Sequence, residues 1–157
     1  NCCKELEQVS FDDGNLVEIV DFTAFADCPK LKKIDFGNCN HLREIGAYSF
    51  SACRNLTGLV LPPNLKSIEG FESCSGLTEI VLPSTVELIK GGAFSNCTEL
   101  KSITIPSSVK YIGCCAFHNC VNLKDVYYQG TKEQWEKIRF DEYCGEISNA
   151  NIHVLNN

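Results

Sequence analysis

Four residues in the last third of the chain carry thiol and imidazole groups, which bind zinc or act as nucleophiles: Cys114, Cys115, His118 and Cys120. A structural zinc site usually shows paired Cys-x-x-Cys units, whereas two of these cysteines are adjacent and must diverge. Cys120 also occupies a repeated position along the chain, which indicates a structural role. The sequence therefore predicts no metal site at this cluster, and we expect no cofactor.

The same cluster is a weak candidate for catalysis. A Cys-His nucleophile also needs an orienting group and a pocket, and the sequence identifies neither. No Ser-His-Asp order, phosphate-binding glycine loop or paired carboxylates is identifiable elsewhere. The other histidines, His41 and His153, are expected on turns or in the C-terminal segment. We predict that the chain is not an enzyme, and an enzyme using this cluster is the least favoured alternative.

The position of Cys120 is explained by a repeat. Each copy has a phenylalanine, a cysteine three residues later, a leucine after three more, and then two apolar residues separated by one position. The copies begin at Phe25, Phe50, Phe71, Phe94 and Phe117. A period of about 20 to 29 residues built on Leu-x-x-Leu-x-Leu indicates a leucine-rich repeat solenoid. The predicted fold is an α/β-type solenoid, mainly β, formed by a right-handed leucine-rich repeat stack.

Each copy contains a short strand. Ile103 and Ile105 alternate with Ser102 and Thr104, which is the pattern of a half-buried strand. Stacked coils would pair these strands into one parallel sheet on one face. Pro106 follows at once and ends the strand, because proline cannot donate to the ladder.

Eleven cysteines are many for 157 residues. Six share the repeat position, and we expect them to be buried and reduced because a small side chain suits one corner of each coil. They are Cys3, Cys28, Cys53, Cys74, Cys97 and Cys120. The others, which follow no repeat, are Cys2, Cys39, Cys114, Cys115 and Cys144. An odd total and parallel side-chain directions argue against a disulfide-locked scaffold.

The C-terminal segment differs from the repeats. Thr131 and Gln134 form a capping-box pattern, so a helix should follow, with Trp135 and Ile138 on one face covering the last coil. Residues 151–155 alternate polar with apolar and predict a final strand. We expect one leucine-rich repeat domain over 1–157, with about six repeats over 1–130 and a C-terminal helical cap over 131–157.

The first residues align with the middle of a repeat, since Cys3 and Leu6 match Cys28 and Leu31. A solenoid normally carries a polar terminal cap. We therefore expect a fragment of a longer protein that lacks its N-terminal cap.

Charge and hydropathy exclude two classes of partner. The formal charge is -6 and the 14 basic residues are scattered among 20 acidic ones, which argues against nucleic acid. No apolar run approaches the roughly 20 residues that cross a bilayer, so we expect no membrane insertion.

Two segments resemble the BspA-type leucine-rich repeat family. They are residues 93–100 with 103–109, which read AFSNCTEL and ITIPSSV, and residues 126–131 running on to Trp135. The resemblance covers essentially the whole chain and implies a surface or secreted protein without a catalytic motif. It implies adhesion or protein binding, and an extracellular or cell-surface location.

The outward strand positions are the predicted partner-binding site, because solenoids bind through the sheet face. Its residues are Val60, Val81, Thr104 and Tyr127, with Glu79, Ser102 and Asp125 beside them. The expected partner is a protein on a host, matrix or neighbouring cell, or a glycan. A structural spacer within a longer surface protein is the alternative function.

Overall fold

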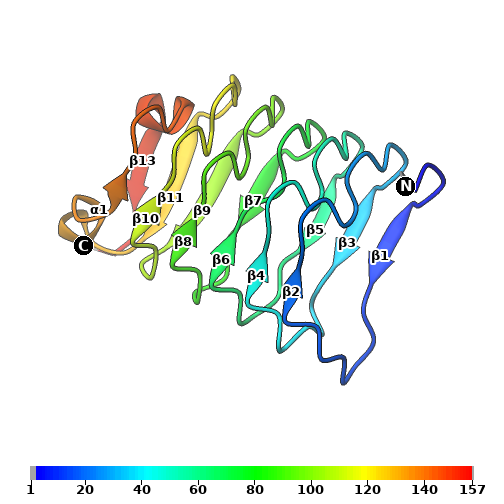
Figure 1. Cartoon of the computed structure of the whole chain (residues 1–157). Helices are drawn as coiled ribbons and strands as arrows, with labels where there is room; N and C mark the ends of the chain where they lie inside the picture. Colours follow the sequence, from blue (N-terminus) through cyan, green and yellow to red (C-terminus); the bar gives the residue numbers. More distant parts are fainter. Residues whose placement is uncertain (1–2, 157) are drawn as a thin grey trace.

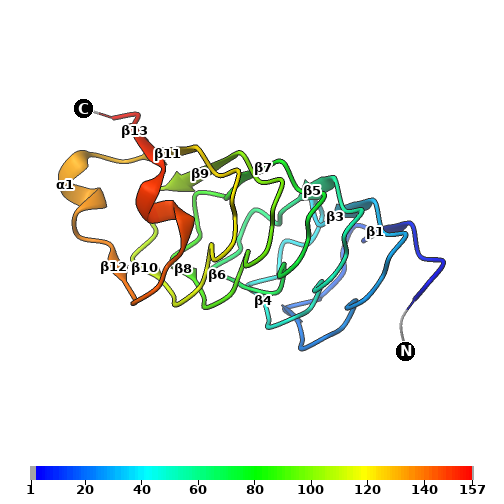
Figure 2. The ribbon, with the colours of Figure 1, turned by 90° about the horizontal axis from the view of Figure 1, so that it is seen from above.

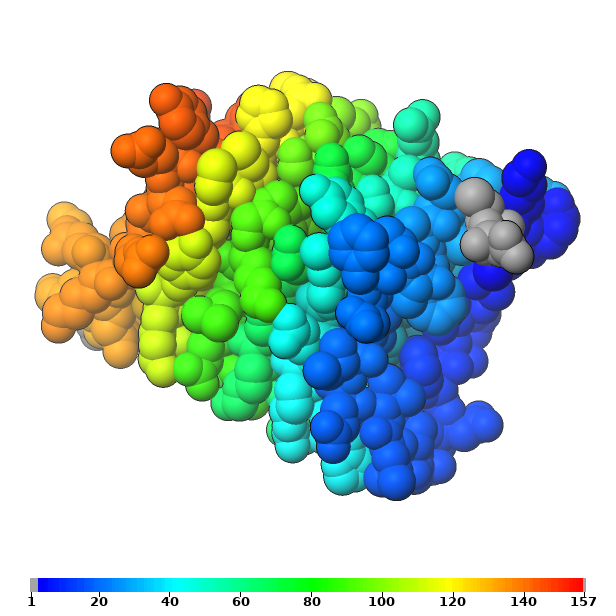
Figure 3. Space-filling view, in the orientation of Figure 1, coloured from blue at the N-terminus to red at the C-terminus, as the bar shows by residue number. Residues whose placement is uncertain are grey.

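The computed structural model describes residues 3–156, and in it the chain winds through successive coils stacked side by side (Figure 1). Successive coils form adjacent bands in the space-filling view, from the N-terminal end to the C-terminal segment (Figure 3). This arrangement confirms the solenoid that the repeat predicted.

Two sets of parallel strands lie on opposite sides of the solenoid (Figure 2). The odd-strand face consists of β1 (Gln8–Ser10), β3 (Lys33–Asp35), β5 (Gly58–Val60), β7 (Glu79–Val81), β9 (Ser102–Pro106), β11 (Asp125–Gln129) and β13 (Asn151–Val154). The even-strand face consists of β2 (Ile19–Val20), β4 (Glu44–Ile45), β6 (Ser67–Ile68), β8 (Leu88–Ile89), β10 (Tyr111–Ile112) and β12 (Arg139–Phe140). Pairing follows the repeat register, so Ile103 lies between Ile80 and Val126.

The odd-strand face is divided, which corrects the prediction of one sheet. The even strands form a single sheet, whereas the odd strands form the sheets β1-β3-β5 and β7-β9-β11-β13. Phe71 follows Phe50 by 21 residues and Phe94 follows Phe71 by 23. The even-strand face stays paired across the same 21-residue step, from β6 to β8, so the interruption is confined to the odd-strand face between β5 and β7.

A ladder of phenylalanine rings runs through the core. The ring centroids of Phe50 and Phe71 are 5.3 Å apart, and those of Phe94 and Phe117 are 5.6 Å apart. The residue before each phenylalanine is small because the preceding coil lies directly against it. At Gly70 a Cβ atom would lie 2.4 Å from the carbonyl oxygen of Gly46.

Five of the six repeat cysteines are buried, namely Cys28, Cys53, Cys74, Cys97 and Cys120. The prediction was wrong for Cys3, which is exposed because no coil covers it among the described residues. Cys39 is buried although it belongs to the inserted segment, residues 37–41, which places five residues between Phe36 and Leu42 where the next coil has three between Leu61 and Leu65. Cys2 lies outside the described residues.

The C-terminal segment is an irregular coil with very little helix, which corrects the expected helical cap. The capping box between Thr131 and Gln134 is present, but α1 (Lys132–Trp135) has a single turn. Ile138 therefore lies beyond the helix, buried, while Trp135 is half-buried against Tyr128. The short helix η1 (Glu146–Asn149) and β13 complete the segment, and β13 confirms the predicted final strand.

Candidate partner-binding surface

The outward side chains of the odd-strand face form two rows that cross the strands. Val60, Val81 and Tyr127 have exposed fractions of 43%, 65% and 37%. Thr104 lies between Val81 and Tyr127 in the same row and is half-buried. The neighbouring row contains Glu79, Ser102 and Asp125. The structure thus places all seven predicted residues on one face, and their role in binding stays a prediction.

Strand β13 extends both rows by one position. His153 pairs with Tyr127 across the two strands, and the two rings stack with centroids 5.0 Å apart. Its Nε2 lies 2.7 Å from Oδ1 of Asp125, and this hydrogen bond lowers the pKa of the Asp125 carboxyl. His153 was expected in the C-terminal segment and was missed as part of the surface. The alternation of polar and apolar residues over 151–155, which predicts a strand, could have indicated that His153 faces outward.

The outward row is interrupted between Val60 and Val81. The two valines sit on adjacent coils, but β5 and β7 are not paired. Leu59 and Leu61 are only partly buried here, whereas the equivalent Ile80 and Leu82 are buried. We call this interruption the seam between β5 and β7. It exposes more apolar surface than the paired part of the face.

The even-strand face carries charges that pair across the coils. Glu87 lies 3.4 Å from Lys66 and 2.6 Å from Lys110, and both contacts lower its pKa. Lys90 pairs with Glu44 two coils away. Exposed pairs of this kind contribute little to stability. The charges in these pairs are already matched within the chain.

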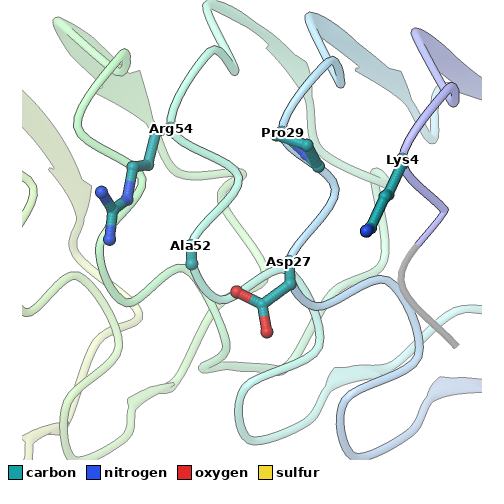
Figure 4. A pocket seen from close by; sticks show the side chains of 5 residues that line it. All are labelled: Lys4, Asp27, Pro29, Ala52 and Arg54. Carbon is teal, nitrogen blue, oxygen red and sulfur yellow. The ribbon is translucent and has the colours of Figure 1, made fainter.

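A surface hollow of about 330 Å³ lies where the first coils meet, and Figure 4 shows its lining. Lys4, Asp27 and Arg54 lie around it together with Pro29 and Ala52. One carboxylate between two cations provides no nucleophile with an adjacent base, so the lining does not suggest catalysis.

The Cys-His cluster is dispersed. Cys120 is buried and its Sγ donates to the carbonyl of Phe94 over 3.1 Å, while His118 is exposed. Cys114 and Cys115 bring their Sγ atoms within 3.3 Å of each other at the surface. Within residues 3–156, no three side chains of His, Cys, Asp or Glu are placed to hold one metal ion.

Comparison with known proteins identifies the repeats. A profile of the BspA type leucine rich repeat region matches residues 1–70 and 69–155, in six copies. Among curated protein sequences, none matches the chain. None of the helices described between residues 3 and 156 is long and hydrophobic enough to span a bilayer.

Several solved structures share the fold. A leucine rich cell surface protein from Faecalibacterium prausnitzii has a TM-score of 0.76 and 28% identity over 88% of this chain. A leucine rich repeat protein of T. pallidum has a TM-score of 0.55 and 30% identity over 73% of this chain. The pneumococcal vaccine antigen PcpA, with 21% identity, a TM-score of 0.58 and 96% of this chain covered, shows the fold alone.

This chain spans only part of those proteins: 36% of the Faecalibacterium chain, 64% of the T. pallidum chain and 40% of PcpA. The repeat profile nevertheless matches nearly every residue of this chain. The chain belongs to the BspA type leucine rich repeat family.

Proposed function

We propose that this chain is a protein-binding module of a cell-surface or secreted leucine-rich repeat protein, and that it contacts its partner through the odd-strand face. The observation that carries the proposal is the outward row, in which exposed Val60 and Val81 lie on one side of Thr104 and the stacked Tyr127 and His153 on the other. Tyrosine is enriched among the residues that dominate binding energy at interfaces.

The rigidity of the row supports this function. Ile103 and Val126, which flank the outward Thr104 and Tyr127, are fully buried, so the paired strands β9 and β11 are anchored in the core. Tyr127 is further restrained because its ring stacks on His153, which is in turn hydrogen-bonded to Asp125. A partner that binds preorganised side chains loses little conformational entropy at the interface.

The class of partner follows from the surface and from the relatives. Valine and tyrosine side chains favour a protein, while a glycan remains the second choice because Tyr127 offers a flat ring. The Faecalibacterium relative is described as a cell surface protein. This description supports the proposal of a cell-surface or extracellular location, where a host, matrix or neighbouring-cell protein would be met.

Binding of the chain to panels of extracellular matrix proteins and glycans tests the proposal. Once a ligand is found, Val81→Glu should weaken binding at least about tenfold, or about 1.4 kcal/mol. Val121→Glu is the matched control, because Val121 is 63% exposed and lies outside the odd strands.

Three outcomes would overturn the proposal. Equal weakening by Val81→Glu and Val121→Glu would mean that charge alone matters. Loss of binding through changes at Asn38, Asn40 or His41, with Val60 and Val81 variants binding normally, would place the site on the inserted segment. A structural spacer would bind none of the panel.

A further inference from the structure

The seam between β5 (Gly58–Val60) and β7 (Glu79–Val81) is wide for neighbouring coils. Most Cα pairs across these two strands are more than 8 Å apart, whereas nearly all pairs across β3 and β5 lie within that distance. Paired strands are separated by about 4.8 Å. The two edges therefore stand farther apart than paired strands do.

The opening is confined by contacts at both ends. On one side Gly76 packs so closely that a Cβ atom would lie 2.7 Å from the carbonyl oxygen of Leu56. On the other side Thr85 Oγ1 lies 2.9 Å from the carbonyl oxygen of Pro63. Behind the seam, β6 pairs with both β4 and β8. These contacts hold the two edges in place, so the seam is a slot rather than a break in the solenoid.

Both edges of the slot present backbone groups to each other. Gly58 donates to Lys32 and Val60 accepts from Phe36, so these residues face β3. Hydrogen-bonding direction alternates along a parallel strand, so the N–H and C=O of Leu59 point toward β7. By the same alternation, Glu79 and Val81 of β7 point toward β5. Among the described residues, no backbone hydrogen bond joins the two strands.

The side chains around the slot are apolar. Val60 and Val81 are exposed at its mouth, and Leu59 and Leu61 are incompletely covered beneath. An extended segment placed between the edges would pair its own backbone on both sides, and apolar side chains on it would cover the two leucines. Strand addition of this kind obtains affinity from main-chain hydrogen bonds and specificity from alternate side chains.

We propose that the seam between β5 and β7 accepts one extended, apolar segment of a partner protein, which adds a strand and completes the odd-strand face. The segment pairs with Leu59 on one side and with Glu79 and Val81 on the other. This inference rests on the proposed function, because it specifies how a partner engages that face.

A synthetic peptide copying residues 100–106 is the probe. That segment contains all of β9, which already pairs with a strand on each side. Backbone hydrogen exchange of the 157-residue chain is followed by NMR with and without the peptide. We expect exchange to slow at least about tenfold at Leu59, Glu79 and Val81, since a hydrogen-bonded amide exchanges only on opening. The control peptide is N-methylated at the residue corresponding to Ile103, which removes one donor.

Variants of the chain test the same contact from the other side. Val81→Pro removes an N–H that faces the slot, whereas Val81→Ala shortens the same side chain and keeps the N–H. Peptide-induced protection at Leu59 should vanish in the first variant and persist in the second. If Val81→Pro does not fold, the N-methylated peptide supplies the equivalent comparison.

Three results would overturn the inference: equal protection by both peptides, protection only at the open edges β1 or β13, or no protection at the seam. Its failure is distinguishable from failure of the proposed function. A protein ligand weakened by Val81→Glu, with no peptide-induced protection, would leave the proposed function standing and remove the slot. Protection at the seam, with no effect of Val81→Glu on binding of a ligand, would leave the slot standing and remove the proposed function.

Discussion

The Sγ atom of Cys97 donates to the carbonyl oxygen of Phe71 in the preceding coil over 3.2 Å. The same contact joins Cys74 to Phe50 over 3.1 Å and Cys120 to Phe94 over 3.1 Å. A buried carbonyl group needs a hydrogen-bond partner, and a thiol is a small side chain that can donate weakly. Each of these carbonyls already accepts from a backbone N–H, as Phe71 does from Cys74, so the cysteine column fills a tight corner and adds a second hydrogen bond that joins neighbouring coils.

Replacing Cys97 by alanine should destabilise the chain by about 0.5 to 1.5 kcal/mol, because the carbonyl of Phe71 loses one of its two donors and keeps the backbone N–H of Cys74. Denaturant unfolding measures the change. Cys114→Ala is the control, since Cys114 is exposed, and should change the free energy of unfolding by less than about 0.5 kcal/mol. Equal stability of the two variants would show that the thiol contact contributes nothing.

The cysteines should divide into two kinetic classes in a thiol titration. Burial raises the pKa of Cys53 to about 11 and that of Cys120 to about 12, so little thiolate exists at neutral pH. Cys114 and Cys115 lie at the surface and should react in the native chain, while the buried column should react only after unfolding. Prompt native reaction of all eleven thiols would contradict this.

Gly70→Ala should be strongly destabilising. Gly70 has a φ of 92°, and an added Cβ would lie 2.4 Å from the carbonyl oxygen of Gly46. Gly92→Ala separates the cost of the positive φ from the cost of the steric clash, because Gly92 has a φ of 67° with nothing within 4 Å of the added Cβ. The conformational cost alone is about 1 to 2 kcal/mol. A thermal unfolding midpoint for Gly70→Ala at or above that of Gly92→Ala would disprove the steric argument.

Trp135→Ala should cost about 2 kcal/mol, less than the about 3 to 5 kcal/mol of a fully buried aromatic side chain. Its ring meets those of Tyr128 and Phe140 at centroid distances of 5.1 and 5.5 Å but remains half-buried. Tyr143→Ala is the comparison, since that side chain is 80% exposed. An unchanged denaturation midpoint for Trp135→Ala would mean that the C-terminal segment does not stabilise the last coil.

The contact between His153 and Asp125 should make the free energy of unfolding depend on pH in the acidic range. The pKa of Asp125 is lowered in the folded state. The contact therefore stabilises the chain above the unfolded-state pKa of about 3.9, and this stabilisation is lost as pH falls through the lower folded-state pKa. The stability difference between wild type and His153→Ala should therefore shrink in that window. NMR titration of the Asp125 carboxyl should show a higher pKa in the variant. An identical pKa in both would exclude the contact.

Periodic features could be predicted from the sequence because each copy of the repeat encodes them locally. The spacing of Phe94, Cys97 and Leu100 predicts one buried corner, and alternation around Thr104 predicts a strand with one outward side. The capping box at Thr131 is likewise a short-range pattern. These predictions were confirmed since identical neighbours above and below impose the same environment on every central coil.

Departures from the repeat were decided by tertiary structure. The interruption between Val60 and Val81, the burial of Cys39, the single turn of α1 and the stacking of His153 on Tyr127 are set by contacts between segments and not by the repeat itself. A sequence shows that one coil is shorter than the next but not on which face the mismatch is absorbed. That choice depends on the packing of residues more than twenty positions apart. Between these two coils the Phe50–Phe71 stack and the pairings of β6 are kept, whereas the ladder between β5 and β7 is interrupted.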